Sequence, residues 1–124
     1  MKNFKFLILA LLLVCLAAAG ALAGVTVDGL IVEIVPEALV NYDLNDYVPG
    51  GMVVDSIIVK TSAANDVICF REGSATGPKF LAAKDLTGGG LVWYTSGGVL
   101  HPYLKWSDCT FSTPANVIIS IKMR

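Results

Sequence analysis

Apolar and polar residues alternate along several short runs of this chain, which is the pattern of β-strands that bury one face. The best-defined example is the stretch 64–80, which reads A-N-D-V-I-C-F-R-E-G-S-A-T-G-P-K-F. Its first half places Val67, Cys69 and Arg71 on one face and Ile68, Phe70 and Glu72 on the other. Residues 73–78 hold two glycines and a proline, which favour a turn. The stretch therefore predicts a hairpin around which the other strands are arranged.

Further strands are expected where β-branched and aromatic residues cluster between turn formers. These runs cover residues 25–35, 52–61, 91–95, 103–108 and 116–122. A break is expected at Asp28-Gly29 and an end at Pro36, because proline cannot donate to a strand ladder. About seven short strands and no convincing helix are typical of an all-β fold, an antiparallel β-sandwich of the jelly-roll type. An up-and-down barrel is the alternative.

Within these runs the alternation also predicts which side chains share a face. The expected sets are Leu30 with Val32 and Ile34, Leu104 with Trp106, Tyr103 with Lys105, and Val117 with Ile119 and Ile121. Residues 41–51 are the most polar stretch and are expected to form a loop.

The first 23 residues have the three parts of a secretory signal peptide. Lys2 and Lys5 precede an apolar run over residues 6–16, and Ala21-Leu22-Ala23 is a small-x-small cleavage site. An uncleaved anchor is the alternative; a lipoprotein is disfavoured because Val14, not a small residue, precedes Cys15. We therefore expect a helical signal segment that is cleaved after Ala23, which gives a secreted, periplasmic or cell-surface product. Residues 24–124 are expected to form one β-sandwich domain.

Removal of residues 1–23 changes both the charge and the cysteine content. The whole chain has 9 basic and 10 acidic residues. Without Lys2 and Lys5 the mature chain keeps 9 − 2 = 7 basic residues and a net charge of about −3, so a nucleic acid is not an expected partner. Cys69 and Cys109 remain. An even pair in an exported chain favours a disulfide, and two buried free thiols are the alternative.

No pattern in the sequence predicts an enzyme, a cofactor or a metal site. His101 is the only histidine, and no G-x-S-x-G elbow accompanies it. Oxygen donors Asp43, Asn45 and Asp46 lie close together, yet the glycine and glutamate of a calcium-binding EF-hand loop are missing. Turns stabilised by these side chains explain the same residues. The glycines of residues 73–79 do not have phosphate-loop spacing.

Aromatic side chains are the best candidates for contacts with a ligand or a partner. They are Trp93, Tyr94, Tyr103 and Trp106 near the C-terminal strands, and Tyr42 and Tyr47 in the polar stretch. Such residues form stacking platforms for sugars or contact patches for proteins. A core role is favoured for the two tryptophans, which leaves the tyrosines as the stronger interface candidates.

Four stretches resemble small β-sandwich proteins from the structural-gene cassettes of phages and prophages. They are residues 57–60, 66–78, 107–113 and 116–121. The resemblance implies a non-enzymatic structural or decorating role in a multimeric particle. The signal peptide departs from that pattern, because virion proteins assemble in the cytoplasm. Either the domain has been recruited to the cell surface or periplasm, or the resemblance is one of fold alone.

Three hypotheses on function follow. The first is an exported structural or interaction domain that associates with protein, as a homo-oligomer or in a larger assembly. The second is a carbohydrate- or surface-binding module, which an exposed tryptophan beside Tyr94 would favour and a buried pair of tryptophans would exclude. The third is a hydrolase, which requires a cleft that holds His101 with an acid or a hydroxyl within hydrogen-bond reach.

Overall fold

A computed structural model describes residues 24–95 and 97–124 of the chain. Within these residues the structure has two antiparallel β-sheets and no helix of seven or more residues, which confirms the all-β class. The predicted signal peptide, with its cleavage site, lies outside the described residues. Within the described part of the chain, no helix is long and apolar enough to cross a membrane.

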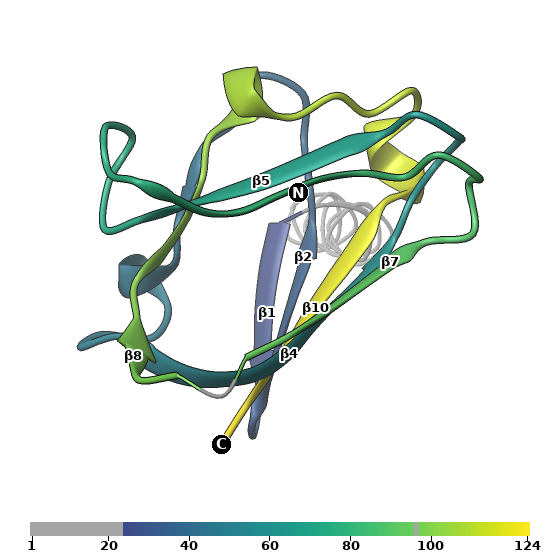
Figure 1. Cartoon of the computed structure of the whole chain (residues 1–124). Coiled ribbons are helices and arrows are strands. Elements are labelled where there is room, and N and C mark those ends of the chain that lie inside the picture. Colours follow the sequence, from purple (N-terminus) through teal and green to yellow (C-terminus); the bar gives the residue numbers. More distant parts are fainter. Residues whose placement is uncertain (1–23, 96) are drawn as a thin grey trace, which may run out of the picture.

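The larger sheet is antiparallel throughout and begins with a hairpin of the first two strands (Figure 1). In spatial order its strands are β1 (Gly24–Asp28), β2 (Ile31–Val35), β10 (Ile118–Met123), β4 (Met52–Lys60) and β7 (Leu91–Tyr94). The short β8 (Val99–Leu100) pairs with the first residues of β4. The sheet therefore has free edges at β1 and at β7.

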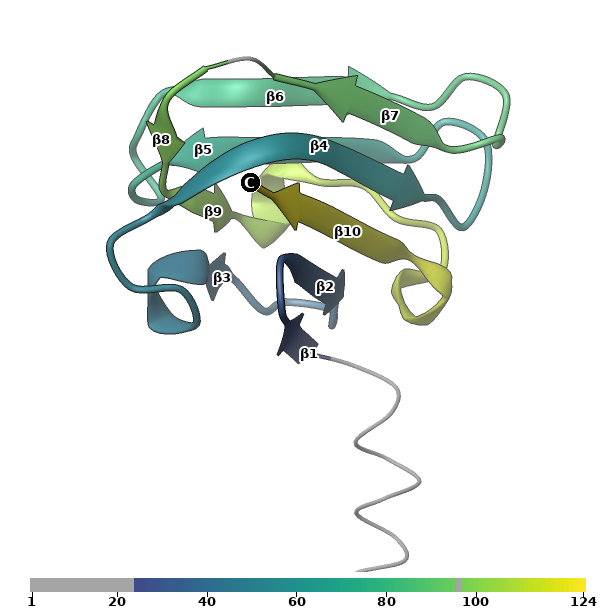
Figure 2. The same ribbon diagram turned by 90° about the horizontal axis from the view of Figure 1, so that it is seen from below.

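The smaller sheet contains the hairpin that the sequence predicted, with residues 73–78 as its turn (Figure 2). Its strands, in spatial order, are β3 (Tyr42–Asp43), β9 (Pro102–Leu104), β5 (Val67–Glu72) and β6 (Lys79–Lys84). Three short 3-10 helices complete the described part of the chain: η1 (Leu44–Asp46), η2 (Trp106–Asp108) and η3 (Pro114–Asn116).

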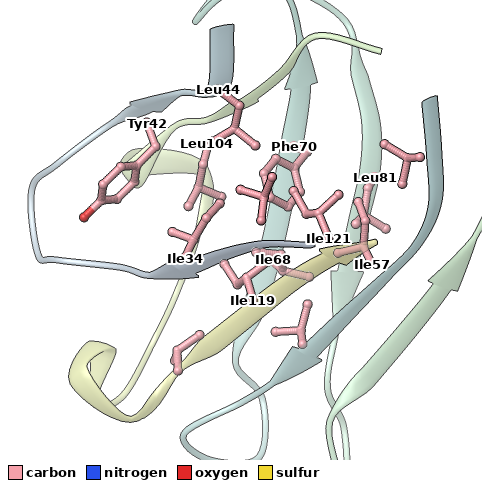
Figure 3. Packing of buried hydrophobic residues seen from close by; sticks show 14 of the residues in the cluster. Ile34, Tyr42, Leu44, Ile57, Ile68, Phe70, Leu81, Leu104, Ile119 and Ile121 are labelled. Atoms are coloured by element: carbon pink, nitrogen blue, oxygen red, sulfur yellow. The ribbon is translucent and has the colours of Figure 1, made fainter. Parts of the chain in front are cut away.

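Both sheets contribute side chains to one hydrophobic core (Figure 3). Ile34, Ile57, Ile119 and Ile121 come from the larger sheet, and Ile68, Phe70, Leu81 and Leu104 from the smaller one. The alternation predicted for β2 and β10 is confirmed, because Val32, Ile34, Val117, Ile119 and Ile121 are all fully buried. Leu30, which was grouped with Val32 and Ile34, is 57% exposed because it lies in the turn between β1 and β2.

Two predicted segments differ from the structure. The strand expected over residues 103–108 stops at Leu104, where the chain turns into η2, and the Trp106 N–H donates to the Asn41 side chain at 2.8 Å. Trp106 therefore does not share a strand face with Leu104. The polar stretch is more ordered than a loop, since it contains β3 and η1, and Leu44 of η1 is fully buried.

Candidate interaction surface

The two acidic residues that bracket the β5–β6 hairpin are buried, and the sequence analysis did not identify them. Asp66 precedes β5 and accepts hydrogen bonds from the Ser62 N–H (2.7 Å), the Ser62 hydroxyl (2.6 Å), the Ala63 N–H (3.2 Å) and the Ser112 N–H (3.1 Å). Burial alone would raise its pKa, but these donors outweigh burial and hold the pKa below its usual value. Asp66 thus joins the β4–β5 loop to the segment that precedes η3.

Asp85 follows β6 and has a similar role. Its carboxylate accepts from the Thr61 hydroxyl and from the N–H groups of Thr87 (3.2 Å), Gly88 (2.9 Å) and Gly90 (2.8 Å). The Thr61 hydroxyl is the main cause of a lowered Asp85 pKa, and the backbone donors add to it against the effect of burial. Every donor belongs to this chain, so the arrangement closes the glycine-rich turn and leaves no free ligand for a cation.

His101 is held by Glu72 in an arrangement that joins β5 to the start of β9. Its Nδ1 lies 2.7 Å from Glu72 Oε1, and its backbone N–H donates to both carboxylate oxygens at 2.9 and 3.0 Å. The opposite side of the ring packs on Gly51, where an added Cβ would come within 2.7 Å of Nε2. The acid that a hydrolase requires is therefore present, but none of the described hydrogen bonds links the ring to a hydroxyl or a thiol.

The two cysteines are free thiols in the structure, so the predicted disulfide is not formed in it. Their sulfur atoms have different partners, which is the physical reason. The Cys69 thiol lies 3.9 Å from Asp108 Oδ2, whereas the Cys109 thiol points at the Cys69 carbonyl oxygen at 3.8 Å. Asp108 is in turn held by Arg71 at 2.6 and 3.2 Å. The arginine is the main cause that lowers the Asp108 pKa.

The predicted aromatic candidates do not form one platform. Trp93 packs on Phe80 with ring centroids 5.7 Å apart, and Trp106 packs on Phe111 at 6.1 Å. Both tryptophans are half-buried against the core. Tyr94 follows Trp93 directly and therefore points from the opposite face of β7, where it is 76% exposed. A sugar platform of Trp93 beside Tyr94 is incompatible with this alternation.

The four tyrosines differ in accessibility. Tyr42 is buried, and its hydroxyl accepts from the Glu37 N–H at 3.1 Å, so it presents no contact surface. Tyr103 is half-buried, on β9. Tyr47 and Tyr94 are exposed. Asp43 accepts from the Asn45 N–H at 3.0 Å, as an Asx turn does, and no cluster of metal-binding side chains occurs in the described residues.

An exposed apolar group lies on the outer face of the larger sheet, at its β7 edge. Ile58 of β4 and Val92 of β7 are direct cross-strand partners, and Tyr94 is the next outward residue on β7. They are 50%, 54% and 76% exposed. We call these three residues the β7 patch. The sequence analysis had identified only Tyr94, because whether Ile58 faces water depends on which face of β4 the second sheet covers.

The free edges of the two sheets differ in charge. Strand β6 carries Lys79 and Lys84 at its two ends, and β3 is only two residues long; both features discourage pairing with another chain. Strand β7 has no charged residue, and β1 has only Asp28. The edges of the larger sheet are therefore the ones open to a partner.

Comparisons of the chain with protein-family models, with curated proteins and with solved structures found no match.

Proposed function

We propose that this chain is an exported, non-catalytic structural or interaction domain that binds protein through the free edges of its larger sheet. In this proposal the chain is cleaved after Ala23, and the two sheets form a β-sandwich of the jelly-roll type. The resemblance to phage structural proteins agrees with a place in a multimeric or decorating assembly. No cofactor takes part.

The β7 patch is the observation that supports this proposal best. Single exposed apolar side chains are ordinary on a soluble protein, whereas a contiguous group beside an uncharged strand edge is typical of a binding surface. An extended partner segment could pair with β7 and cover Val92 and Tyr94 with its own side chains. The end of the hairpin where β5 begins and β6 ends, by contrast, holds two acids that are buried and hydrogen-bonded within the chain.

Site-specific photo-crosslinking in an exporting bacterium tests the proposal. A photoreactive residue at Val92 is expected to give a discrete cross-linked protein product. The same residue at Leu86, which is 71% exposed in a loop, is the matched control and is expected to give none. Absence of a product at Val92, or equal products at both positions, would contradict a binding role for the patch. Mass spectrometry of the exported chain tests cleavage separately, by whether it begins at Gly24.

A further inference from the structure

Strand β1 is the second unprotected edge and is the first segment after the predicted cleavage site. It reads G-V-T-V-D and pairs with β2 alone. Val27 is 43% exposed although it points toward the core side, because no second-sheet strand covers the end of β1. On the outer face, Thr26 and Asp28 line a groove together with Ile31 and Glu33. The strand has neither a lysine nor a proline to prevent pairing.

The backbone of β1 is prepared to accept one more antiparallel strand. Asp28 and Ile31 flank a two-residue turn, and Gly29 has the positive φ of 57° that such a hairpin requires. Residues flanking a two-residue turn form a hydrogen-bonded pair, and the pairs then alternate along the ladder. Thr26 is therefore bonded to β2, whereas Val25 and Val27 direct their N–H and C=O groups outward.

A second copy of β1 satisfies these outward groups in one register. When two β1 strands run antiparallel about a two-fold axis at Thr26, Val25 of each copy faces Val27 of the other. Both are the residues with free backbone groups, so two hydrogen-bonded pairs form, and the two Thr26 residues meet in the closer, non-hydrogen-bonded position. In the same register Gly24 of one copy faces Asp28 of the other.

Cleavage after Ala23 gives that register its charge complementarity. Gly24 then carries the α-ammonium group, which faces the Asp28 carboxylate of the second copy, and the two-fold axis creates this pair twice. Asp28 is the only charged side chain of β1, so no like charges oppose each other along the strand. Before cleavage, an uncharged peptide bond joins Ala23 to Gly24, and the favourable pair does not exist.

We infer that the mature chain dimerises by antiparallel pairing of β1 with β1 of a second copy, and that removal of residues 1–23 enables this pairing. The inference rests on the proposed function, because the ammonium group exists only in an exported and cleaved chain. The dimer would join two larger sheets into one and leave a β7 patch at each far end, free for other partners. One strand per copy is a small contact, so the dimer is expected to be concentration-dependent.

Sedimentation velocity on the protein purified after export tests the inference, with intact mass establishing the first residue. We expect a monomer–dimer equilibrium for wild type over a wide range of concentration. Thr26→Lys places two like charges at the two-fold axis and should yield a monomer with an unchanged circular dichroism spectrum. Leu86→Lys adds the same charge at an exposed loop position away from both edges and should dimerise as wild type does. Asp28→Asn preserves a turn-forming residue and should weaken dimerisation about tenfold, in proportion to two exposed ion pairs.

Several outcomes would overturn the inference. If the wild-type chain begins at Gly24 and stays monomeric at every concentration, the inferred dimer is contradicted. Export and a binding role of the β7 patch are not contradicted by that result. Dissociation by Val92→Lys, with Thr26→Lys still dimeric, assigns the contact to β7 instead. If a chain that keeps residues 1–23 dimerises equally well, the inferred role of the ammonium group is contradicted. Wild-type affinity in Asp28→Asn also contradicts that role.

Discussion

The two ends of the β5–β6 hairpin are stabilised in contrasting ways. At the end where β5 begins and β6 ends, Asp66 and Asp85 are 1% and 2% exposed and accept hydrogen bonds from several loops. At the turn end, Glu72 pairs with His101. The Glu72 side chain is 29% exposed and the His101 side chain is 38% exposed. Buried carboxylates with many donors contribute far more to stability than exposed ion pairs do. The first end should therefore behave as the structural anchor, and the turn end as the tolerant one.

Acid should remove the stabilisation that the buried carboxylates Asp66 and Asp85 provide, and this is the largest expected effect. The folded-state pKa values of Asp66 and Asp85, and of Asp108 in η2, which pairs with Arg71 of β5, are lowered relative to the unfolded chain. A lowered carboxyl pKa stabilises the fold fully at a pH above the unfolded value of about 3.9, and that contribution is lost as the pH falls through the folded values. Thermal unfolding across pH should show a steep loss below about pH 4. A melting temperature that stays constant down to the lowest pH would contradict this account.

Asp66→Asn should be the most damaging single substitution of the two ends. The amide keeps the shape but loses the charge, and its NH₂ group then faces backbone donors. We expect the free energy of unfolding to fall by about 2–4 kcal/mol, measured by chemical denaturation. Asp46→Asn, at an exposed acid of η1, is the matched control and should change it by less than about 0.5 kcal/mol. Equal effects of the two variants would show that the Asp66 hydrogen bonds do not anchor the loops.

The turn end should tolerate the corresponding change. Glu72→Gln removes the charge opposite His101 and keeps an oxygen that can accept from the His101 N–H. Exposed ion pairs contribute about 0.2–1 kcal/mol, so denaturation should show a loss within that range. High salt should reduce the difference between variant and wild type when the His101 ring is protonated, because salt screens an exposed ion pair and leaves a neutral hydrogen bond unaffected. A loss as large as that of Asp66→Asn would mean that both ends are anchors.

The difference between the two ends also explains what the sequence could predict. The hairpin itself follows from local signals, namely the alternation over residues 67–72 and the turn formers after them. The role of Asp66 does not, because one of its donors comes from Ser112, far along the chain, and a distant partner leaves no periodic signal. The β7 patch depends similarly on which face of β4 the second sheet covers. β3 and β8, at two residues each, are too short to show any alternation.

Cys109 follows η2, and its thiol lies against Cys69 of β5, between the two ends of the hairpin. Its chemical reactivity provides the last prediction, which concerns no loss of stability. Burial is the main cause that raises the pKa of its thiol from 9.0 to about 12. Because the thiolate is the reactive form, a rise of about three units lowers its population at neutral pH about a thousandfold. Labelling of the folded protein with a thiol reagent at pH 7.5 should therefore be slow at Cys109, and fast at both cysteines once the chain is unfolded. Cys109→Ser should leave the remaining slow labelling of Cys69 unchanged, since burial also raises the pKa of Cys69. A purified chain lighter by two hydrogens and unreactive even when unfolded would instead establish a Cys69–Cys109 disulfide and contradict this prediction.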